Sequence, residues 1–351
     1  MKNYLVSVII PVYNGVGNGI EDCLNSVISQ DIMEKEIIVI DDFSTDNSNQ
    51  IINLMLKKTS VNFTIKSHDT NQGLSKSLNE GLNISSGKYI LIIQQDCALI
   101  GKSELRDSIE YMEKENIKVL VGSTATNFNS LNDYQKLFKI RISETSEIQI
   151  RNNKIYITQL KCDLFKAEVF STIGEFDYVH KTVGQDFVLS SRLFKNNIEM
   201  YTFDKFLFKI RYEGEKSFKS ICLKEFRYAL AVPYISSIWK NDQFLRRSID
   251  IQAKSKVKER LLNIILPFLF LLGFFTFSLY SNNIVLYSII IVGISWILIA
   301  LSRIIPVFLT YNKKRTVVFY SFLYLVTDFI YFTGFLVGLV YLIKVKIGME
   351  E

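Results

Sequence analysis

Short apolar runs alternate with longer amphipathic segments over the first 121 residues. The runs, each a predicted strand, are Val6–Ile10, Glu36–Ile40, Asn62–Lys66, Lys88–Ile93 and Lys118–Val121. The segments between them are predicted helices. Three are Gly17–Ser29, Gly73–Ile84 and Ser103–Lys114. Another begins at a cap formed by Asp46 or Ser48 and runs through Leu56. This alternation predicts an α/β fold with a parallel, doubly wound sheet.

The pattern weakens after this region. Asn127–Lys154 is polar and irregular, which is typical of a covering loop or of added strands, and Gln159–Tyr201 resumes compact structure. Residues 217–256 are predicted to be helical. The stretch Arg246–Arg260, which overlaps the end of this region, is basic and partly amphipathic. It either lies on a lipid surface or forms a solvated linker helix.

Three apolar runs fill the C-terminal part, namely Leu261–Tyr280, Ile284–Leu301 and Val317–Ile343. A helix needs ~20 apolar residues to cross the hydrocarbon core of a bilayer, so the first two runs predict one crossing each. The third run is longer and contains Asp328, Gly334 and Gly338, which favours a tilted span or a kinked helix. We therefore expect two or three transmembrane helices.

Basic residues beside these runs predict the orientation. Four of them precede the first run (Lys254, Lys256, Lys258, Arg260), the loop Ser281–Asn283 has no charge, and Arg303 and Lys313–Arg315 follow the second run. This pattern places the N-terminal domain on the cytoplasmic side of a multi-pass cell-membrane protein. Lys344 and Lys346 argue against a simple third crossing.

Charge and cysteine content exclude several other classes. The net charge of +6 is attributed to the membrane-proximal bases, because no RNA-binding motif supports a nucleic-acid partner. The apolar start Leu5–Pro11 is too short for a signal peptide. The four cysteines lack CxxC spacing, which indicates a reducing compartment and no zinc site.

Polar residues gather where three predicted strands end, at Pro11–Asn14, Asp41–Asp46 and Gln94–Cys97. Ligands of parallel sheets bind outside the carboxyl ends of the strands. Asp41 and Asp42 could accept hydrogen bonds from a ligand or cap the next helix. Asp96 could hold Mg2+ or Mn2+ beside phosphate oxygens, or be a turn residue. Asp186 begins a predicted helix, where a carboxylate could serve as a base or as a cap.

Six segments in succession resemble the motifs of family 2 glycosyltransferases with a GT-A fold. They are SVIIPVYN (Ser7–Asn14), IIVIDDFSTDNS (Ile37–Ser48), NQGLSKSLNEGL (Asn71–Leu82), GKYILIIQQDC (Gly87–Cys97), STIGEFD (Ser171–Asp177) and GQDFVLSSRL (Gly184–Leu193). The resemblance covers about residues 5 to 215. It implies a Rossmann-like, mostly parallel sheet, and we expect a catalytic domain over residues 1–230, basic juxtamembrane helices over 231–260 and transmembrane helices over 261–346.

The resemblance also implies roles for single residues. Pro11, Tyr13 and Asn14 would line the nucleotide pocket, Asp42 would bind the base of the nucleotide, and Asp41 would support the loop. Asp96 corresponds to the last aspartate of the family's DxD element, which coordinates a divalent metal. Asp186 corresponds to the general base of the ED motif. The remaining candidates for binding the nucleotide sugar are Lys76, Gln95, Arg192 and Arg211, with Arg192 either holding its loop or contacting phosphate.

Two departures from the family pattern remove negative charge. The DxD element reads Gln94-Gln95-Asp96, and the ED element reads Gln185-Asp186. Both changes replace a carboxylate by an amide of similar shape, so metal affinity and donor preference are expected to differ. Tyr212 stands where some relatives have a histidine, and His180 near Asp186 is interpreted as a loop residue without a role.

The sequence thus predicts an inverting, metal-dependent transferase of hexosyl type. A nucleotide sugar would be the donor, and a membrane-associated polyprenyl-linked oligosaccharide or other glycolipid the acceptor, in the assembly of cell-surface polysaccharide or glycan. Two alternatives stay open. One is a polyprenyl-phosphate sugar synthase, and the other is a membrane-bound assembly partner that has lost activity, which the two amides motivate. A transporter is disfavoured, because Asp328 is the only ionisable residue inside the apolar runs except at their ends.

Overall fold

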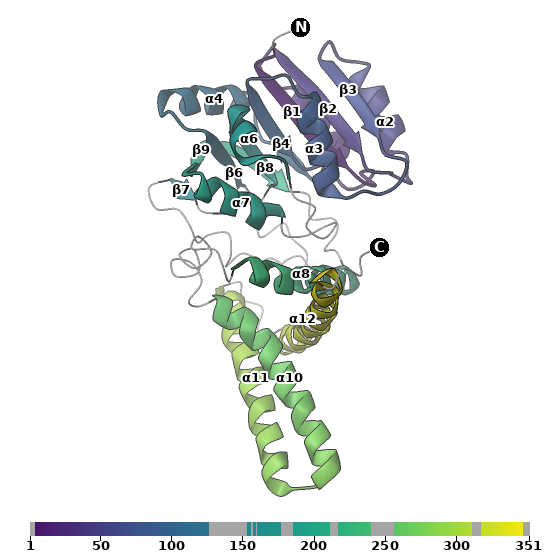
Figure 1. Ribbon diagram of the computed structural model, residues 1–351, viewed down its shortest axis with the longest axis vertical. Coiled ribbons are helices and arrows are strands. Elements are labelled where there is room, and N and C mark those ends of the chain that lie inside the picture. The colour runs from purple at the N-terminus through teal and green to yellow at the C-terminus, as the bar shows by residue number, and fades with distance from the viewer. Residues whose placement is uncertain are drawn as a thin grey trace. The chain divides into compact units, whose positions relative to one another are not determined.

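The computed structural model describes residues 4–125, 153–155, 157–158, 160–176, 185–210, 217–239, 256–310 and 317–346. Contacts divide the chain into two compact units (Figure 1). The first comprises Met1–Ser130 and Gln149–Glu213, and the second comprises Leu131–Ile148 and Gly214–Glu351. The domain boundaries expected at residues 230 and 260 stay a prediction.

The first unit alternates strands and helices as the sequence pattern predicts. Its elements are β1 (Val6–Val12), α1 (Ile20–Ile28), β2 (Lys35–Asp41), α2 (Ser48–Leu56), β3 (Asn62–Ser67), α3 (Leu74–Ile84), β4 (Tyr89–Ile93), β5 (Cys97–Leu99), α4 (Glu104–Lys114), β6 (Val119–Thr124), β7 (Lys154–Ile155), β8 (Cys162–Lys166), α6 (Glu168–Ile173), α7 (Gln185–Lys195) and β9 (Met200–Ile210). Each strand and helix expected before residue 122 is present, with ends shifted by a few residues.

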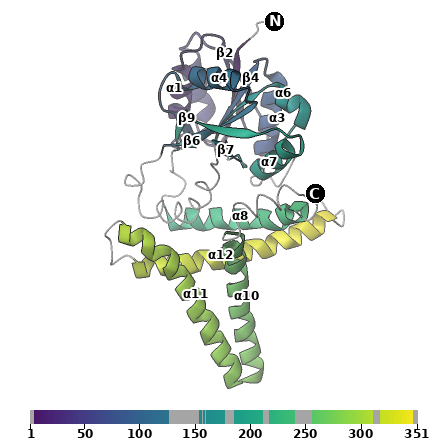
Figure 2. The ribbon, with the colours of Figure 1, turned by 90° about the vertical axis from the view of Figure 1, so that its left-hand side faces the viewer.

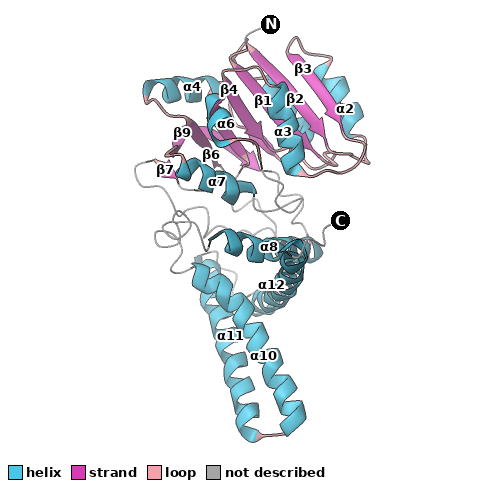
Figure 3. Cartoon of the chain, in the orientation of Figure 1, coloured by secondary structure: helices cyan, strands magenta, loops and turns pink. Residues whose placement is uncertain are grey.

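The strands form one sheet in the order β3-β2-β1-β4-β8-β6-β9-β5, with β7 beside β9 (Figure 3). β1, β2, β3 and β4 pair in parallel, as do β6 and β9. β8 lies antiparallel between β4 and β6, and β5 and β7 are antiparallel to β9. The predicted α/β fold with a mostly parallel sheet is confirmed, whereas the reversal of β8 was not anticipated.

Both faces of the sheet are buried under helices. Val8 and Ile10 of β1 face one core, which they share with residues of α1, α2 and α4. Ile9, which points the opposite way because strand side chains alternate, packs in a second core with residues of α3, α6 and α7. A strand buried on both faces needs a continuous apolar sequence, which explains why β1, β2 and β4 are the clearest strands in the sequence.

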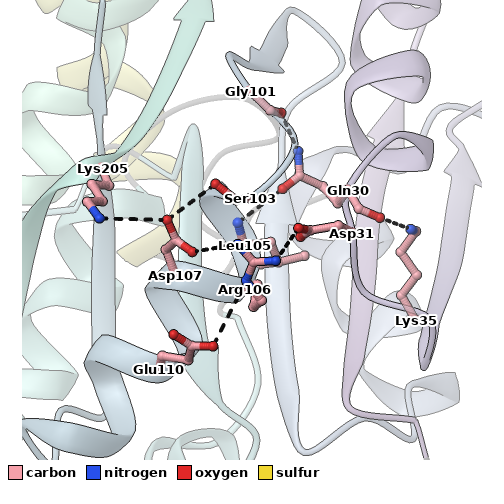
Figure 4. A network of polar contacts seen from close by, with 10 residues as sticks. All are labelled: Gln30, Asp31, Lys35, Gly101, Ser103, Leu105, Arg106, Asp107, Glu110 and Lys205. Carbon is pink, nitrogen blue, oxygen red and sulfur yellow. Dashed lines mark hydrogen bonds and ion pairs between the residues drawn. The ribbon is translucent and has the colours of Figure 1, made fainter.

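A polar network fastens the end of α1 to the start of α4 (Figure 4). The Gln30 side chain accepts a hydrogen bond from the backbone N–H of Leu105 at 3.0 Å and donates one to the carbonyl of Gly101 at 2.7 Å. The Nζ of Lys35 donates to the Gln30 carbonyl, and Arg106 pairs with Asp31. Because the first N–H groups of a helix have no partner within it, Gln30 satisfies one that would otherwise be buried unpaired.

The second unit contains the helices α8 (Phe218–Trp239), α10 (Lys256–Tyr280), α11 (Asn283–Thr310) and α12 (Val317–Lys346). Among the described residues, Asn283–Leu301 and Phe322–Ile343 are long and apolar enough to cross a membrane. The apolar part of α10, Ile264–Tyr280, is shorter. These stretches fall within the three runs that the sequence singles out.

Two glycines of α12 allow α8 to pack closely along it (Figure 2). A Cβ atom placed on Gly334 would lie 2.5 Å from the carbonyl oxygen of Phe226, and one on Gly338 would meet the carbonyl oxygen of Leu230. Small residues spaced four apart let helix backbones approach in this way. The glycines that we associated with a kink therefore have a packing role.

We predict that Gly334→Ala destabilises the second unit. The new methyl group meets main-chain atoms that cannot rotate away, and overpacking of this kind costs ~1–3 kcal/mol. Thermal unfolding of the full chain in detergent measures the effect. Gly293→Ala of α11 is the matched control, because its Cβ would meet only the ring of Phe270, at 3.2 Å. Equal melting temperatures for the two variants would contradict the packing role of Gly334.

Candidate active site

Four neighbouring strands bring the polar loops of the sequence to one edge of the sheet. β2, β1 and β4 lie side by side in parallel, so their carboxyl ends meet. The antiparallel β8 starts at the same edge, because its first residue, Cys162, pairs with Ile93, the last residue of β4. The segments after β1, β2 and β4 and the segment before β8 are thus neighbours, although they come from distant parts of the chain.

Asp42 is buried at the end of β2, and its carboxylate is held by its surroundings. Its two oxygens accept hydrogen bonds from the backbone N–H groups of Gln72 at 2.7 Å and Gly73 at 2.8 Å. The Nδ1 of His68 lies 2.7 Å from Oδ1. A carboxylate has about four acceptor positions, so Asp42 retains capacity for one further donor. Its role in binding a nucleotide base stays a prediction.

His68 is a site residue to which the sequence analysis gave no role. Its ring is buried and bridges two acids, with Nε2 lying 2.7 Å from Oε2 of Glu80. Burial would raise the pKa of Glu80, but hydrogen bonds from Lys66 and His68 lower it overall. The sequence around His68 does not indicate these partners, because Asp42 and Glu80 lie 26 and 12 residues away.

The loops after β1 and β2 are tied to each other. The Asn14 side chain accepts a hydrogen bond from the N–H of Thr45 at 2.8 Å, and the Asn14 N–H donates to Oγ of Ser44 at 2.9 Å. Asp41 accepts from the N–H of Ser44 at 3.0 Å, so its carboxylate contacts the loop after β2, and its supporting role stays a prediction. Asn14 has a φ of 48°, a left-handed conformation that asparagine tolerates better than most residues.

Gln95 joins the end of β4 to the end of β1. Its side-chain amide accepts from the N–H of Tyr13 at 2.9 Å and donates to the carbonyl of Tyr13 at 2.9 Å. The Tyr13 side chain remains 47% exposed, so its ring can contact a ligand at this edge. Pro11 lies within β1 and is buried.

Asp96 forms an ion pair with Lys161, which immediately precedes β8. The Nζ of Lys161 lies 2.8 Å from Oδ2 and 3.1 Å from Oδ1 of Asp96. The two side chains are 28% and 33% exposed, so the pair faces the surface of the unit. No local sequence pattern relates Lys161 to Asp96, because 65 positions separate the two residues.

The start of α7 is held against the segment before β8. The N–H of Thr158 donates to Oγ of Ser190 at 3.0 Å, and this hydroxyl donates to the carbonyl of Asp186 at 2.6 Å. Asp186 lies in the first turn of α7 and is partly buried. Thr158 thus contacts α7, while Leu160 and Lys161 contact the end of β4.

Asp163 is a fully buried acid close to Asp186. Thr158 Oγ1 and the N–H of Leu160, at 3.1 Å, donate to Oδ2, while Oδ1 has no hydrogen-bond partner among the described residues. Burial, together with the negative charge of Asp186, raises the pKa of Asp163 to about 7, although the two hydrogen bonds act to lower it. Like His68, Asp163 could not be recognised as a candidate from the sequence, because the residues around it have the pattern of an ordinary strand.

Residues 7–174 match the family model described as Glycosyl transferase family 2. Over this part the chain is similar to the glycosyltransferases of family 2. The match includes the loops after β1, β2 and β4 and the segment before β8, and it ends before α7.

The poly(ribitol-phosphate) beta-glucosyltransferase of Bacillus spizizenii is 26% identical to this chain over 253 residues, which make up 71% of this chain and 39% of that protein. Glycosyltransferase GlyA of Streptococcus pneumoniae is 27% identical over 220 residues, or 56% and 30% of the two chains. The chain therefore spans less than half the length of these relatives.

Among solved structures, a mannosyltransferase from Pyrobaculum calidifontis in complex with GDP-Man and Mn2+ has a TM-score of 0.58 and 14% identity. The alignment covers 95% of this chain and 87% of that chain. At this level of identity the likeness shows the fold.

A divalent metal, which the family implies, finds few ligands here. Asp96 is the one carboxylate of the Gln94-Gln95-Asp96 element, and Lys161 contacts both of its oxygens. The side chain of Gln94 donates to the carbonyl of Leu160, and that of Gln95 is bonded to Tyr13. In the part of the chain that the structure describes, no group of three His, Cys, Asp or Glu could hold a metal ion. These residues do not fit a metal held by the protein.

Arg192 and Lys76, two other predicted site residues, contact further parts of the first unit. Arg192 donates to the carbonyls of Ile173 and Glu175, so it holds α7 to the end of α6. Lys76 lines a cavity of about 180 Å³ beside α3, together with Lys66 and Glu80. Arg211, like His180 and Tyr212, lies outside the described residues. Their roles in binding a donor stay predictions.

We predict that Asp163 makes the stability of the first unit depend on pH. Because its pKa is raised, the folded chain retains a proton that the unfolded chain releases above about pH 4. Stability therefore falls as the pH rises towards 7. Asp163→Asn, which is neutral at every pH, should gain stability relative to the wild type by on the order of 2–3 kcal/mol between pH 5 and pH 8.

Melting temperatures of the full chain at several pH values measure this difference. Asp69→Asn, at an exposed position, is the control with the same change of charge. A pH profile for Asp163→Asn that runs parallel to that of the wild type would show that Asp163 is ionised throughout this range.

Proposed function

We propose that this chain transfers a sugar from a nucleotide-sugar donor to a hydroxyl group of a membrane-associated acceptor, with inversion at the anomeric carbon. The match of residues 7–174 to the model of glycosyltransferase family 2 supports the transferase activity. The remainder of the proposal depends on a series of contacts. Asp96 pairs with Lys161. Thr158, which lies shortly before Lys161 in the chain, is bonded to Ser190, and Ser190 is bonded to the start of α7. This series links the end of β4, where a donor would bind, to the proposed base.

In the proposed reaction, Asp186 acts as the general base. It takes the proton of the acceptor hydroxyl as the oxygen attacks the anomeric carbon. The bond between that carbon and the diphosphate oxygen breaks, and its electron pair leaves with the nucleoside diphosphate. One displacement inverts the configuration. An ionised carboxylate within hydrogen-bond distance is sufficient to orient the hydroxyl and to accept its proton.

The donor would lie along the loops after β1, β2 and β4. The exposed ring of Tyr13 offers a face for the nucleotide, and Asp42 has capacity for one more hydrogen bond. Pro11, Asn14, Asp41 and Gln95 would shape this pocket through the contacts that hold the loops together. Lys76, Arg192 and Arg211 remain candidates for contacts with the donor.

The Mg2+ or Mn2+ predicted at Asp96 would shield the diphosphate if it were bound there. No step above depends on it, because the described residues offer one carboxylate that is already paired with Lys161. The Mn2+ of the Pyrobaculum mannosyltransferase motivates testing the metal directly.

The acceptor is proposed to be a polyprenyl-linked oligosaccharide or other glycolipid used in cell-surface polysaccharide assembly. Two apolar helices long enough to cross a membrane support membrane association. The basic residues beside the apolar runs support a multi-pass protein with a cytoplasmic catalytic unit. A polyprenyl-phosphate acceptor and a non-catalytic assembly role are the alternatives to be tested.

We predict that Asp186→Asn lowers turnover about a hundredfold or more and leaves donor binding nearly unchanged, because the amide keeps the shape of the side chain but cannot accept the proton. Release of nucleoside diphosphate from a panel of UDP- and GDP-sugars, with polyprenyl-diphosphate glycans as acceptors, measures turnover. Thermal shift with the same sugars measures binding.

Asp204→Asn, on the exposed part of β9, is the control. Loss of binding together with turnover in Asp186→Asn would argue against the base role. A wild-type chain that binds a donor but never turns it over would favour the non-catalytic alternative.

A further inference from the structure

We propose that the ammonium group of Lys161 takes the place of a protein-bound divalent metal in this enzyme. It would bind the diphosphate of the donor and stabilise the negative charge that grows on it as the glycosidic bond breaks. The inference rests on the proposed function, because it concerns the same donor site.

Lys161 is fixed at the point where the diphosphate would lie. Its carbonyl accepts a hydrogen bond from the N–H of Gln94 at 2.9 Å, which ties its main chain to the end of β4. The next residue, Cys162, begins β8 and pairs with Ile93. The side chain therefore extends from a rigid part of the sheet edge, and Asp96 holds its Nζ at 2.8 and 3.1 Å.

The charges at the end of β4 disfavour a divalent cation. Gln94 and Gln95 are neutral, and the charge of Asp96 is balanced by that of Lys161. A Mg2+ or Mn2+ ion prefers anionic oxygen ligands and would have to displace the ammonium group from the one carboxylate of the Gln94-Gln95-Asp96 element. A diphosphate would instead meet a positive group that is already in position.

The chemistry of the ammonium group suits this role. It combines three N–H donors with a full positive charge, and phosphate oxygens accept hydrogen bonds from such a group. Lysine binds phosphate as a point charge in many nucleotide sites. About a third of the Lys161 side chain is exposed, so a ligand can reach it. Asp96 would then act as a positioning residue that holds the lysine.

Binding of UDP and GDP, compared with uridine and guanosine, tests the proposal on the full chain in detergent. In EDTA, the wild type should bind one of the diphosphates at least tenfold more tightly than its nucleoside. Lys161→Met, which keeps length but removes charge, should reduce this preference by about tenfold to a hundredfold, the range for hydrogen bonds to charged groups. Lys161→Arg should retain most of it.

The matched control is Lys118→Met. Lys118 pairs with Glu168 at 2.9 Å and precedes β6, which starts at the opposite edge of the sheet. Its variant should bind the diphosphates like the wild type. Melting temperatures of the ligand-free variants identify any general loss of folding, and Lys161→Arg separates the loss of charge from the loss of the residue.

Two results would overturn the proposal. One is wild-type binding of the diphosphates that appears only when Mn2+ is added. The other is a preference for diphosphate in EDTA that Lys161→Met leaves intact. Failure of the proposed function looks different, because the wild type would then bind neither UDP nor GDP in EDTA or in Mn2+.

Discussion

The antiparallel pairing of β8 with β4 is the constraint on which the candidate site depends. A further parallel strand would bring its carboxyl end to this edge, and its beginning would lie on the far side of the sheet. Because β8 runs the other way, its first residues reach the edge where β1, β2 and β4 end. Lys161 and Asp163 owe their places to this reversal, and so does the contact of Thr158 with α7.

The buried polar groups around this edge show how the loops keep one conformation. Asp42, enclosed by His68 and two backbone N–H groups, fixes the loop that leads into α3. Such a group is costly to bury unless its partners are in place, so alternative loop conformations that lose a partner are disfavoured. Asp163 is the exception, since one of its oxygens has no partner among the described residues.

Much of the fold could be predicted from the sequence, because β1, β2 and β4 are continuous apolar runs that end in polar residues. The positions of Asp41, Asp42 and Asp96 at strand ends follow from the same pattern. The short strands β5 and β7 have no periodicity to detect, and nothing local encodes the direction of β8. The pairs Asp96–Lys161 and Asp42–His68 join residues 65 and 26 positions apart, which a single sequence does not relate.

One contact in the second unit bears on how the helices reach their final arrangement. The Nε1 of Trp296 on α11 donates to Oδ2 of Asp328 on α12 at 2.9 Å, and both side chains are buried. In a lipid environment a lone carboxyl group on α12 would be expensive to expose to hydrocarbon. For a chain placed in a bilayer, insertion of α12 would therefore be coupled to the earlier presence of α11, and the order of synthesis would also be the order of assembly.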